Sequence, residues 1–348
     1  MYSFGAISLN WLFTLFIRLS YIMANNIPII QQMRYEKMEE FIQSINYGGE
    51  LYNIFKEGNF VFRGHASDKY VLVPSALRPQ SHDWFCRLVL SSKQKEDLER
   101  IQMSSEYNLL RRFYKSCDRR GLLIPYIERI RQTFHEKLDI DTMLRSEYWL
   151  PQDLWEIAAL AQHYGVPTRL LDWTYDRNTA LYFSIEDQLE GKSLPDGTMH
   201  IVLWALNIDP IVTAPNLGLP LRLVQPIYHG NPNLAAQQGM FTLWQTKKVV
   251  NLENGKVEID HKTLTNRKPL DELLQEYATV SGNHTKPYLY KVELPISEGK
   301  SLYHYLHAIG YDASRIYPGY YGATKAVMHE HFLYDEILDT GIAIALAT

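Results

Sequence analysis

Helical and strand-like patterns occupy different parts of the chain, and this segregation constrains the fold more than any other feature. Apolar residues recur at helical spacing in the first half, where we expect helices at 33–45, 93–118, 126–138 and 153–164. Runs of β-branched and aromatic residues dominate the second half, where we expect strands at 198–206, 239–244, 249–252, 256–260 and 288–294. This predicts an α+β fold, a mixed or antiparallel sheet core with an N-terminal helical layer, rather than a doubly wound parallel sheet.

A few shorter elements complete this prediction. Strands are expected early, at 59–63 and 70–73, and Pro74 closes the second one. Further helices are expected at 179–185, 297–309 and 323–333.

The length and composition favour a single large domain. The chain has 348 residues, 46% of them hydrophobic, so it can bury a substantial core without disulfides or metals. We find no internal repeat or long linker, and we predict one elaborated domain over residues 24–348, with a helical insertion at about 80–150. Residues 1–23 differ in character, because their apolar run from Ile7 to Ile17 is short for a bilayer span and follows no basic residue. We interpret them as a dispensable extension, with translation starting at Met23; a signal or anchor is the alternative.

Charge and cysteine content exclude some classes of protein. A net charge of -4 argues against a broad cationic face for nucleic acid, although a local basic groove stays open. Cys86 and Cys117 lack metal-ligand spacing and can form at most one bridge, so a disulfide-built secreted scaffold is not expected. We therefore expect a cytoplasmic protein that needs neither a metal nor a membrane.

The segment from Ala161 to Glu186 is unusually dense in polar side chains between two apolar helices. It brings together Gln162, His163, Thr168, Arg169, Asp172, Trp173 and Thr174. Buried polar groups are costly unless they are fully paired, so this density indicates either a functional site or an internal hydrogen-bond network. In the second case, Asp172 caps a helix or pairs with Arg169.

Arg63 and Gly64 lie at the end of the strand predicted at 59–63, where a side chain can project into a cleft. The planar fork of an arginine clamps a phosphate or carboxylate with two hydrogen bonds. Gly64 would let a ligand approach the backbone closely. The alternative is an internal ion pair between Arg63 and Asp172, which needs the same fork geometry.

Several motifs together resemble the FRG domain family. They are Phe62-Arg63-Gly64, Leu72-Val73-Pro74-Ser75-Ala76-Leu77-Arg78, Ala161-Gln162-His163-Tyr164-Gly165, Pro167 to Thr174, Ala180 to Phe183, Ala236 to Phe241, Gly310-Tyr311-Asp312 and Ile316 to Gly322. The resemblance runs from about residue 30 to about residue 335, and its most specific part is the run Thr168 to Thr174. It restricts function only weakly, since the family is named for its motif and has no settled activity.

A fainter resemblance, to ADP-ribosyltransferases, implies a specific chemistry with NAD+ as substrate. Arg63 would bind the diphosphate, the Gly64 backbone the carboxamide, and Thr174 would support the arginine. Tyr182 would stack on the nicotinamide ring, while Gln162, His163 and Arg169 complete the cofactor-binding set. The late glutamate of that family has no match, because Gln237-Gln238-Gly239 stands in its place and the amide of Gln238 can only orient a hydroxyl.

The carboxylate would then come from Asp172 or Glu330, so the resemblance implies Arg63, Asp172 and Thr174 as catalytic residues. The acceptor would be an unknown protein or nucleic acid. A non-catalytic module that binds a nucleotide-like small molecule or a modified polymer is the main alternative. A metal-dependent phosphodiesterase or nuclease built on His163 and Asp172 is a further one, although no complete set of metal ligands is present.

Overall fold

The computed structural model describes residues 27–81, 98–125, 131–132, 134, 146–213, 218–247, 250–253, 256–259, 266–281 and 286–333. The extension 1–23, most of the predicted helix at 126–138 and much of the insertion at 80–150 lie outside these ranges.

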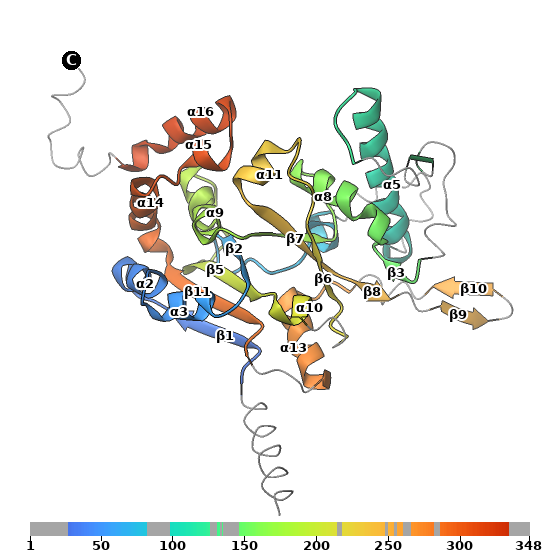
Figure 1. Ribbon diagram of the computed structural model, residues 1–348, viewed down its shortest axis with the longest axis horizontal. Coiled ribbons are helices and arrows are strands. Elements are labelled where there is room, and N and C mark those ends of the chain that lie inside the picture. Colours follow the sequence, from blue (N-terminus) through green and yellow to red (C-terminus); the bar gives the residue numbers. More distant parts are fainter. Residues whose placement is uncertain are drawn as a thin grey trace, which may run out of the picture.

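A seven-stranded sheet organises the described part of the chain, with strand order β1-β11-β5-β2-β4-β7-β6 (Figure 1). The pair β1–β11 is parallel and the other neighbours are antiparallel, so the sheet is mixed and the predicted α+β class is confirmed. The strands are β1 Ile30–Arg34, β2 Phe60–His65, β4 Leu170–Thr174, β5 His200–Asn207, β6 Leu221–Val224, β7 Gly239–Trp244 and β11 Leu289–Pro295. Two small ribbons pair β3 Tyr148–Trp149 with β8 Thr246–Lys247, and β9 Val250–Glu253 with β10 Lys256–Ile259.

The helices cover both faces of this sheet (Figure 1). They are α2 Met38–Ile45, α3 Glu50–Lys56, α5 Leu98–Arg119, α8 Trp155–His163, α9 Arg177–Leu189, α10 Asp209–Thr213, α11 Pro232–Ala236, α13 Leu270–Ser281, α14 Gly299–Ala308, α15 Ala313–Ile316 and α16 Tyr320–His329. Short 3-10 turns occur at Ser75–Leu77, Gln152–Leu154 and Ile296–Glu298.

Successive side chains along the strands point to opposite faces of the sheet, where they pack into three separate hydrophobic cores. On one face, Val61, Trp173 and Trp204 pack with α13. On the other face, the strands β2, β5 and β11 pack with α2, α9 and α14, whereas β4 and β7 pack with α5 and α8. The interior strand β5 is buried along nearly its whole length, as expected for a strand covered on both faces. The two cores that share a face meet above β2 and β4.

Two local predictions were wrong and several elements were missed. Met33 lies in strand β1 because residues 30–34 pair with β11, so the first helix begins only at Met38. The predicted strand 70–73 forms turns, with the Val73 amide donating to the Val71 carbonyl. Helices α3 and α13 and strand β6 were not predicted.

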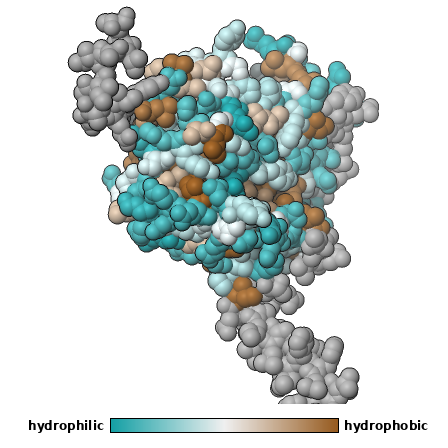
Figure 2. All heavy atoms as spheres, turned by 60° about the vertical axis from the view of Figure 1, so that its left-hand side comes forward, coloured by the Kyte–Doolittle hydropathy of each residue, from teal (hydrophilic) through white to brown (hydrophobic). Residues whose placement is uncertain are grey.

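The surface shown in Figure 2 is mostly hydrophilic, and its hydrophobic side chains form small separate patches. Patches of this kind are normal on a protein surface. None of the helices in the described ranges combines the length and apolar character that a membrane crossing needs.

Candidate ligand-binding site

A cavity of about 460 Å³ opens above β2 and β4, between the two cores that share one face of the sheet. This volume is within the usual range for small-molecule sites. Its floor comes from β2, β4 and β7, and its walls from α8, α9, α11 and the segment around α15 and α16. The lining includes Phe62, Arg63, Gly64, Gln162, His163, Asp172, Trp173, Thr174, Phe183, Asn233, Gln237, Tyr317 and Tyr321.

The cavity lies where the sheet divides. Strands β2 and β4 pair at a single position, Phe62 with Thr174, and no further pair follows toward Asp172. Arg63 bridges this opening, because its Nη1 donates to the backbone oxygen of Asp172 at 2.8 Å and to Oδ2 of the same residue at 3.3 Å. The guanidinium thus takes the place of a strand-to-strand hydrogen bond and forms an ion pair at the same time.

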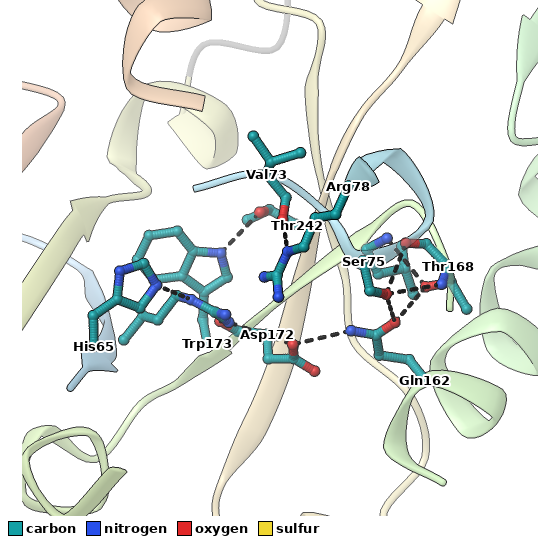
Figure 3. A network of polar contacts seen from close by, with 11 residues as sticks. His65, Val73, Ser75, Arg78, Gln162, Thr168, Asp172, Trp173 and Thr242 are labelled. Carbon is teal, nitrogen blue, oxygen red and sulfur yellow. Dashed lines mark hydrogen bonds and ion pairs between the residues drawn. The ribbon is translucent and has the colours of Figure 1, made fainter. Parts of the chain in front are cut away.

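Asp172 is held from both sides but stays accessible (Figure 3). Gln162 on α8 donates from Nε2 to Asp172 Oδ2 at 3.0 Å. The Gln162 Oε1 accepts hydrogen bonds from Ser75 Oγ at 3.1 Å and from Thr168 Oγ1 at 2.8 Å, which fixes the orientation of the amide. Both donors to the carboxylate use Oδ2, and half of the Asp172 side chain is exposed (50%), so Oδ1 is the oxygen left for a ligand.

His65 fixes the other edge of Arg63. The Arg63 Nε donates to His65 Nε2 at 2.9 Å. Burial, with the positive charges of Arg63 and Arg78 adding to it, holds the pKa of His65 well below its usual value. A neutral imidazole accepts this hydrogen bond, so Arg63 commits Nε and Nη1 internally, whereas its Nη2 has no hydrogen-bond partner among the residues that the structure describes.

His163 ends α8 beside the carboxylate and lines the cavity. Burial lowers its pKa, and the negative charge of Asp172 opposes this effect. Thr174 also lines the cavity, but its hydroxyl donates to the Gln237 carbonyl at 2.6 Å rather than supporting Arg63. Trp173 donates from Nε1 to Thr242 Oγ1 at 2.8 Å, which anchors β4 to β7 under the cavity floor.

The family comparison matches this region. Residues 58–193 fit the family model of the FRG domain. The chain contains an FRG domain. The match includes β2, α8, β4 and α9, and therefore Arg63, Gln162 and Asp172. Neither a curated protein nor a solved structure matches the chain.

Three residues predicted for the site lie elsewhere in or near the FRG domain. Tyr182 has no exposed surface and its hydroxyl lies 3.3 Å from His329 Nδ1, so it is a core residue; its neighbour Phe183 lines the cavity instead. Arg169 is 4% exposed and pairs with Glu106 at 2.6 Å within the core between α5 and β4.

Gln238 is exposed and adopts a φ of 46°, in the turn that precedes β7. Its neighbour Gln237 lines the cavity. Glu330, the alternative source of a carboxylate, follows α16 and is not among the lining residues, whereas Asp172 is.

Gly64 serves packing as well as lining the cavity. A Cβ at this position would lie 1.9 Å from the Ala180 oxygen and 2.6 Å from the Ser184 nitrogen. The helix that approaches the Gly64 backbone closely is therefore α9. From the sequence, Gly64 was explained by the close approach of a ligand, whereas the structure explains it by the close approach of a helix.

Sequence reasoning missed Asn233, Tyr317 and Tyr321 as cavity residues. The two tyrosines belong to the run Ile316 to Gly322, which carries part of the resemblance to the FRG family but lies beyond the matched residues 58–193. This resemblance was the one feature of the sequence that could have identified the two tyrosines as cavity residues. Within the described ranges, no three His, Cys, Asp or Glu side chains gather as a metal site would require.

Proposed function

We propose that the cavity binds a nucleotide-like small molecule whose ribose hydroxyl groups donate to Asp172. The observation that carries this proposal is the accessible carboxylate, oriented by Arg63 and Gln162, in a cavity lined with aromatic rings. A fixed carboxylate suits the hydroxyl groups of a ribose, and aromatic side chains suit a planar base. The Nη2 of Arg63 and the ring of His163 are two donors in the lining that suit a phosphate, beside the side chains of Asn233 and Tyr321.

A second candidate is an NAD+-consuming glycosyl transfer, and one observation favours it. Oδ1 of Asp172 carries neither of the two hydrogen bonds that hold the carboxylate, so it can accept a proton from an acceptor O–H or N–H group. In that reaction the acceptor atom bonds to the ribose carbon, the carbon–nitrogen bond to nicotinamide breaks, and its electron pair leaves with the nicotinamide. Asp172 would be the catalytic residue, and Arg63 its positioning residue.

The test measures binding and turnover on the same protein samples. Thermal shift and calorimetry with NAD+ and AMP give affinities, and chromatography in a cell lysate follows the release of nicotinamide. We expect Asp172→Asn to weaken AMP binding about tenfold or more, since the substitution keeps the shape of the side chain but replaces charged hydrogen bonds with weaker neutral ones. Asp196→Asn, in an exposed turn, is the matched control and should bind as the wild type does.

The outcomes separate the candidates. Binding without nicotinamide release supports a binding module. Release that Asp172→Asn and Arg63→Ala both abolish, in folded protein, supports the transferase. Hydrolysis of a phosphodiester bond that stops when a chelator is added would instead support the metal-dependent phosphodiesterase or nuclease. No binding of NAD+ or AMP at millimolar concentration refutes the proposal.

A further inference from the structure

Two side-chain amides line the cavity from the short helix α11. Asn233 lies in the first turn of this helix, and Gln237 follows its last residue. The Gln237 backbone N–H donates to the Asn233 carbonyl at 2.9 Å, so the two residues are one helical turn apart and on the same side of the helix. Both line the cavity, and we call them the amide pair.

The structure fixes which way the Gln237 amide points. Its Nε2 donates to the backbone oxygen of Ile316 at 3.3 Å, and a carbonyl oxygen can only accept, so the nitrogen has to face it. The backbone carbonyl of Gln237 accepts from Thr174 Oγ1 at 2.6 Å, which holds the main chain as well. Gln237 Oε1 has no hydrogen-bond partner among the residues that the structure describes. It is therefore an acceptor that is oriented before any ligand arrives.

The Asn233 amide is not committed in this way. Its side chain is half-buried and makes no hydrogen bond with the described part of the chain. The cap of the helix is a different residue, Asn231, whose Oδ1 accepts from the Leu234 amide at 3.2 Å. The Asn233 amide can thus turn to offer a ligand either its donor or its acceptor.

The oriented acceptor lies beside the aromatic side chains of the cavity. Ile316, which holds the Gln237 amide, directly precedes Tyr317, and Tyr317 lines the cavity. The amide pair can therefore contact the edge of a planar base in this part of the cavity. A ligand that covers Gln237 Oε1 has to supply a donor, because an acceptor that loses water without gaining a partner is costly. A carbonyl group in the same place would face another oxygen.

We infer that the amide pair is a specificity subsite that selects a ring with an N–H donor next to an acceptor. This inference rests on the proposed function, because it names the base of the nucleotide-like ligand. Adenine has this edge, since its 6-amino group donates and the neighbouring ring nitrogen N7 accepts, and amide side chains bind that edge with two hydrogen bonds. Gln237 accepts from the amino group and determines the specificity, and Asn233 donates to the ring nitrogen. The carboxamide of nicotinamide carries the same donor and acceptor, so it is the second source of this chemistry.

The experiment compares AMP with IMP, which has an oxygen in place of the 6-amino group. The two ligands carry the same charge, so Arg63 and Asp172 should contribute equally to both. Calorimetry should show that the wild type binds AMP about tenfold or more tightly than IMP, because a site that binds an N–H group rejects an analogue without it. Gln237→Met should weaken AMP about tenfold and change IMP less than twofold, so the preference disappears.

Three further variants separate specificity from structure. Gln238→Met is the matched control, because Gln238 is the exposed neighbour of Gln237 and does not line the cavity; it should keep the wild-type preference. Gln237→Glu keeps an acceptor but loses the hydrogen bond to Ile316, so it should also keep the preference. Asn233→Ala should weaken AMP and IMP to a similar degree, because the Asn233 amide can turn to suit either base.

The result of Gln237→Met decides the inference. Equal losses of AMP and IMP would mean that Gln237 contacts the ribose, and they would overturn the inference. It would also be overturned if Gln237→Glu lost the preference as Gln237→Met does, since the role would then be structural. Nicotinamide mononucleotide separates the two sources of the chemistry. If Gln237→Met weakens this ligand and leaves AMP unchanged, the carboxamide occupies the subsite; if it changes neither ligand, the amide pair is no subsite.

The design keeps two failures apart. If the wild type binds AMP and Asp172→Asn weakens that binding, the proposed function stands even when the Gln237 variants behave as the wild type. If the wild type binds neither mononucleotide, nor NAD+, at millimolar concentration, the proposed function fails and the specificity subsite fails with it.

Discussion

Replacing Gly64 with alanine tests why the Phe62-Arg63-Gly64 motif ends in a glycine. The added Cβ would lie 1.9 Å from the Ala180 oxygen and 2.6 Å from the Ser184 nitrogen, and both atoms belong to the backbone of α9. Neither can move without displacing the helix from β2. Overpacking a core typically costs about 1–3 kcal/mol, and a clash with rigid backbone belongs at or above the upper end of that range. We expect Gly64→Ala to lower the free energy of unfolding by about 3 kcal/mol or more.

Urea denaturation followed by circular dichroism and by tryptophan fluorescence measures this loss. Gly191→Ala is the matched control, because Gly191 has a φ of 63° and open space around its Cβ position. It should cost only about 1–2 kcal/mol, the penalty for an alanine in the left-handed region. If Gly64→Ala instead unfolds at the wild-type urea concentration and loses only ligand affinity, the packing argument is wrong and Gly64 serves the ligand.

Two further predictions concern stability. Arg169→Ala should cost about 3–5 kcal/mol, because it leaves the buried Glu106 carboxylate without its cationic partner, yet calorimetry on the folded fraction should give wild-type AMP affinity. If Arg169→Ala weakened AMP binding, Arg169 would contribute to the ligand-binding site after all. Burial, followed by the charge of Lys325, lowers the pKa of His329 to about 4, so the unfolded chain takes up the proton first and stability should fall as the pH drops from about 6.5 to 4. For Glu293, burial raises the pKa but hydrogen bonds from its neighbours outweigh it and set the value at about 2, so a second loss should follow between about 4.5 and 2. Urea midpoints measured against pH for His329→Gln and Glu293→Gln check this. His329→Gln should remove only the loss of stability at the higher pH, and Glu293→Gln only the loss at the lower pH.

The fold was predictable where a local pattern coincided with a long-range role. The strand β5 was found because it is apolar on both faces, and α8 because its periodicity ends at Gly165. The start of the first helix was predicted wrongly. Met33 fits helical spacing, but it belongs to strand β1, whose state depends on pairing with β11, more than 250 residues away in the chain. Tertiary contacts of this kind override a short pattern.

The site was predictable to a similar extent. Density of polar groups pointed to Gln162, His163 and Asp172, which do meet Arg63 in one cavity. The same density led to the prediction of Arg169 as a site residue. Its actual partner is Glu106, on a helix 63 residues earlier, and no sequence pattern shows this pairing. Tyr182 and Phe183 are adjacent aromatics on α9, and only the helix orientation decides which of them is in the core and which lines the cavity.

The structure shows the internal ion pair of Arg63, and this pair does not exclude the second interpretation of Arg63 as a ligand clamp. Its guanidinium closes the opening between β2 and β4 with Nε and Nη1, and this is why the Asp172 carboxylate is held at the cavity floor rather than free to rotate. A carboxylate that is fixed before the ligand arrives loses little conformational entropy on binding. If the proposed function holds, Arg63 acts on recognition mainly through Asp172. Substituting it should reduce affinity even for a ligand that carries no phosphate, such as adenosine, and a loss confined to phosphorylated ligands would show that the clamp is its principal role.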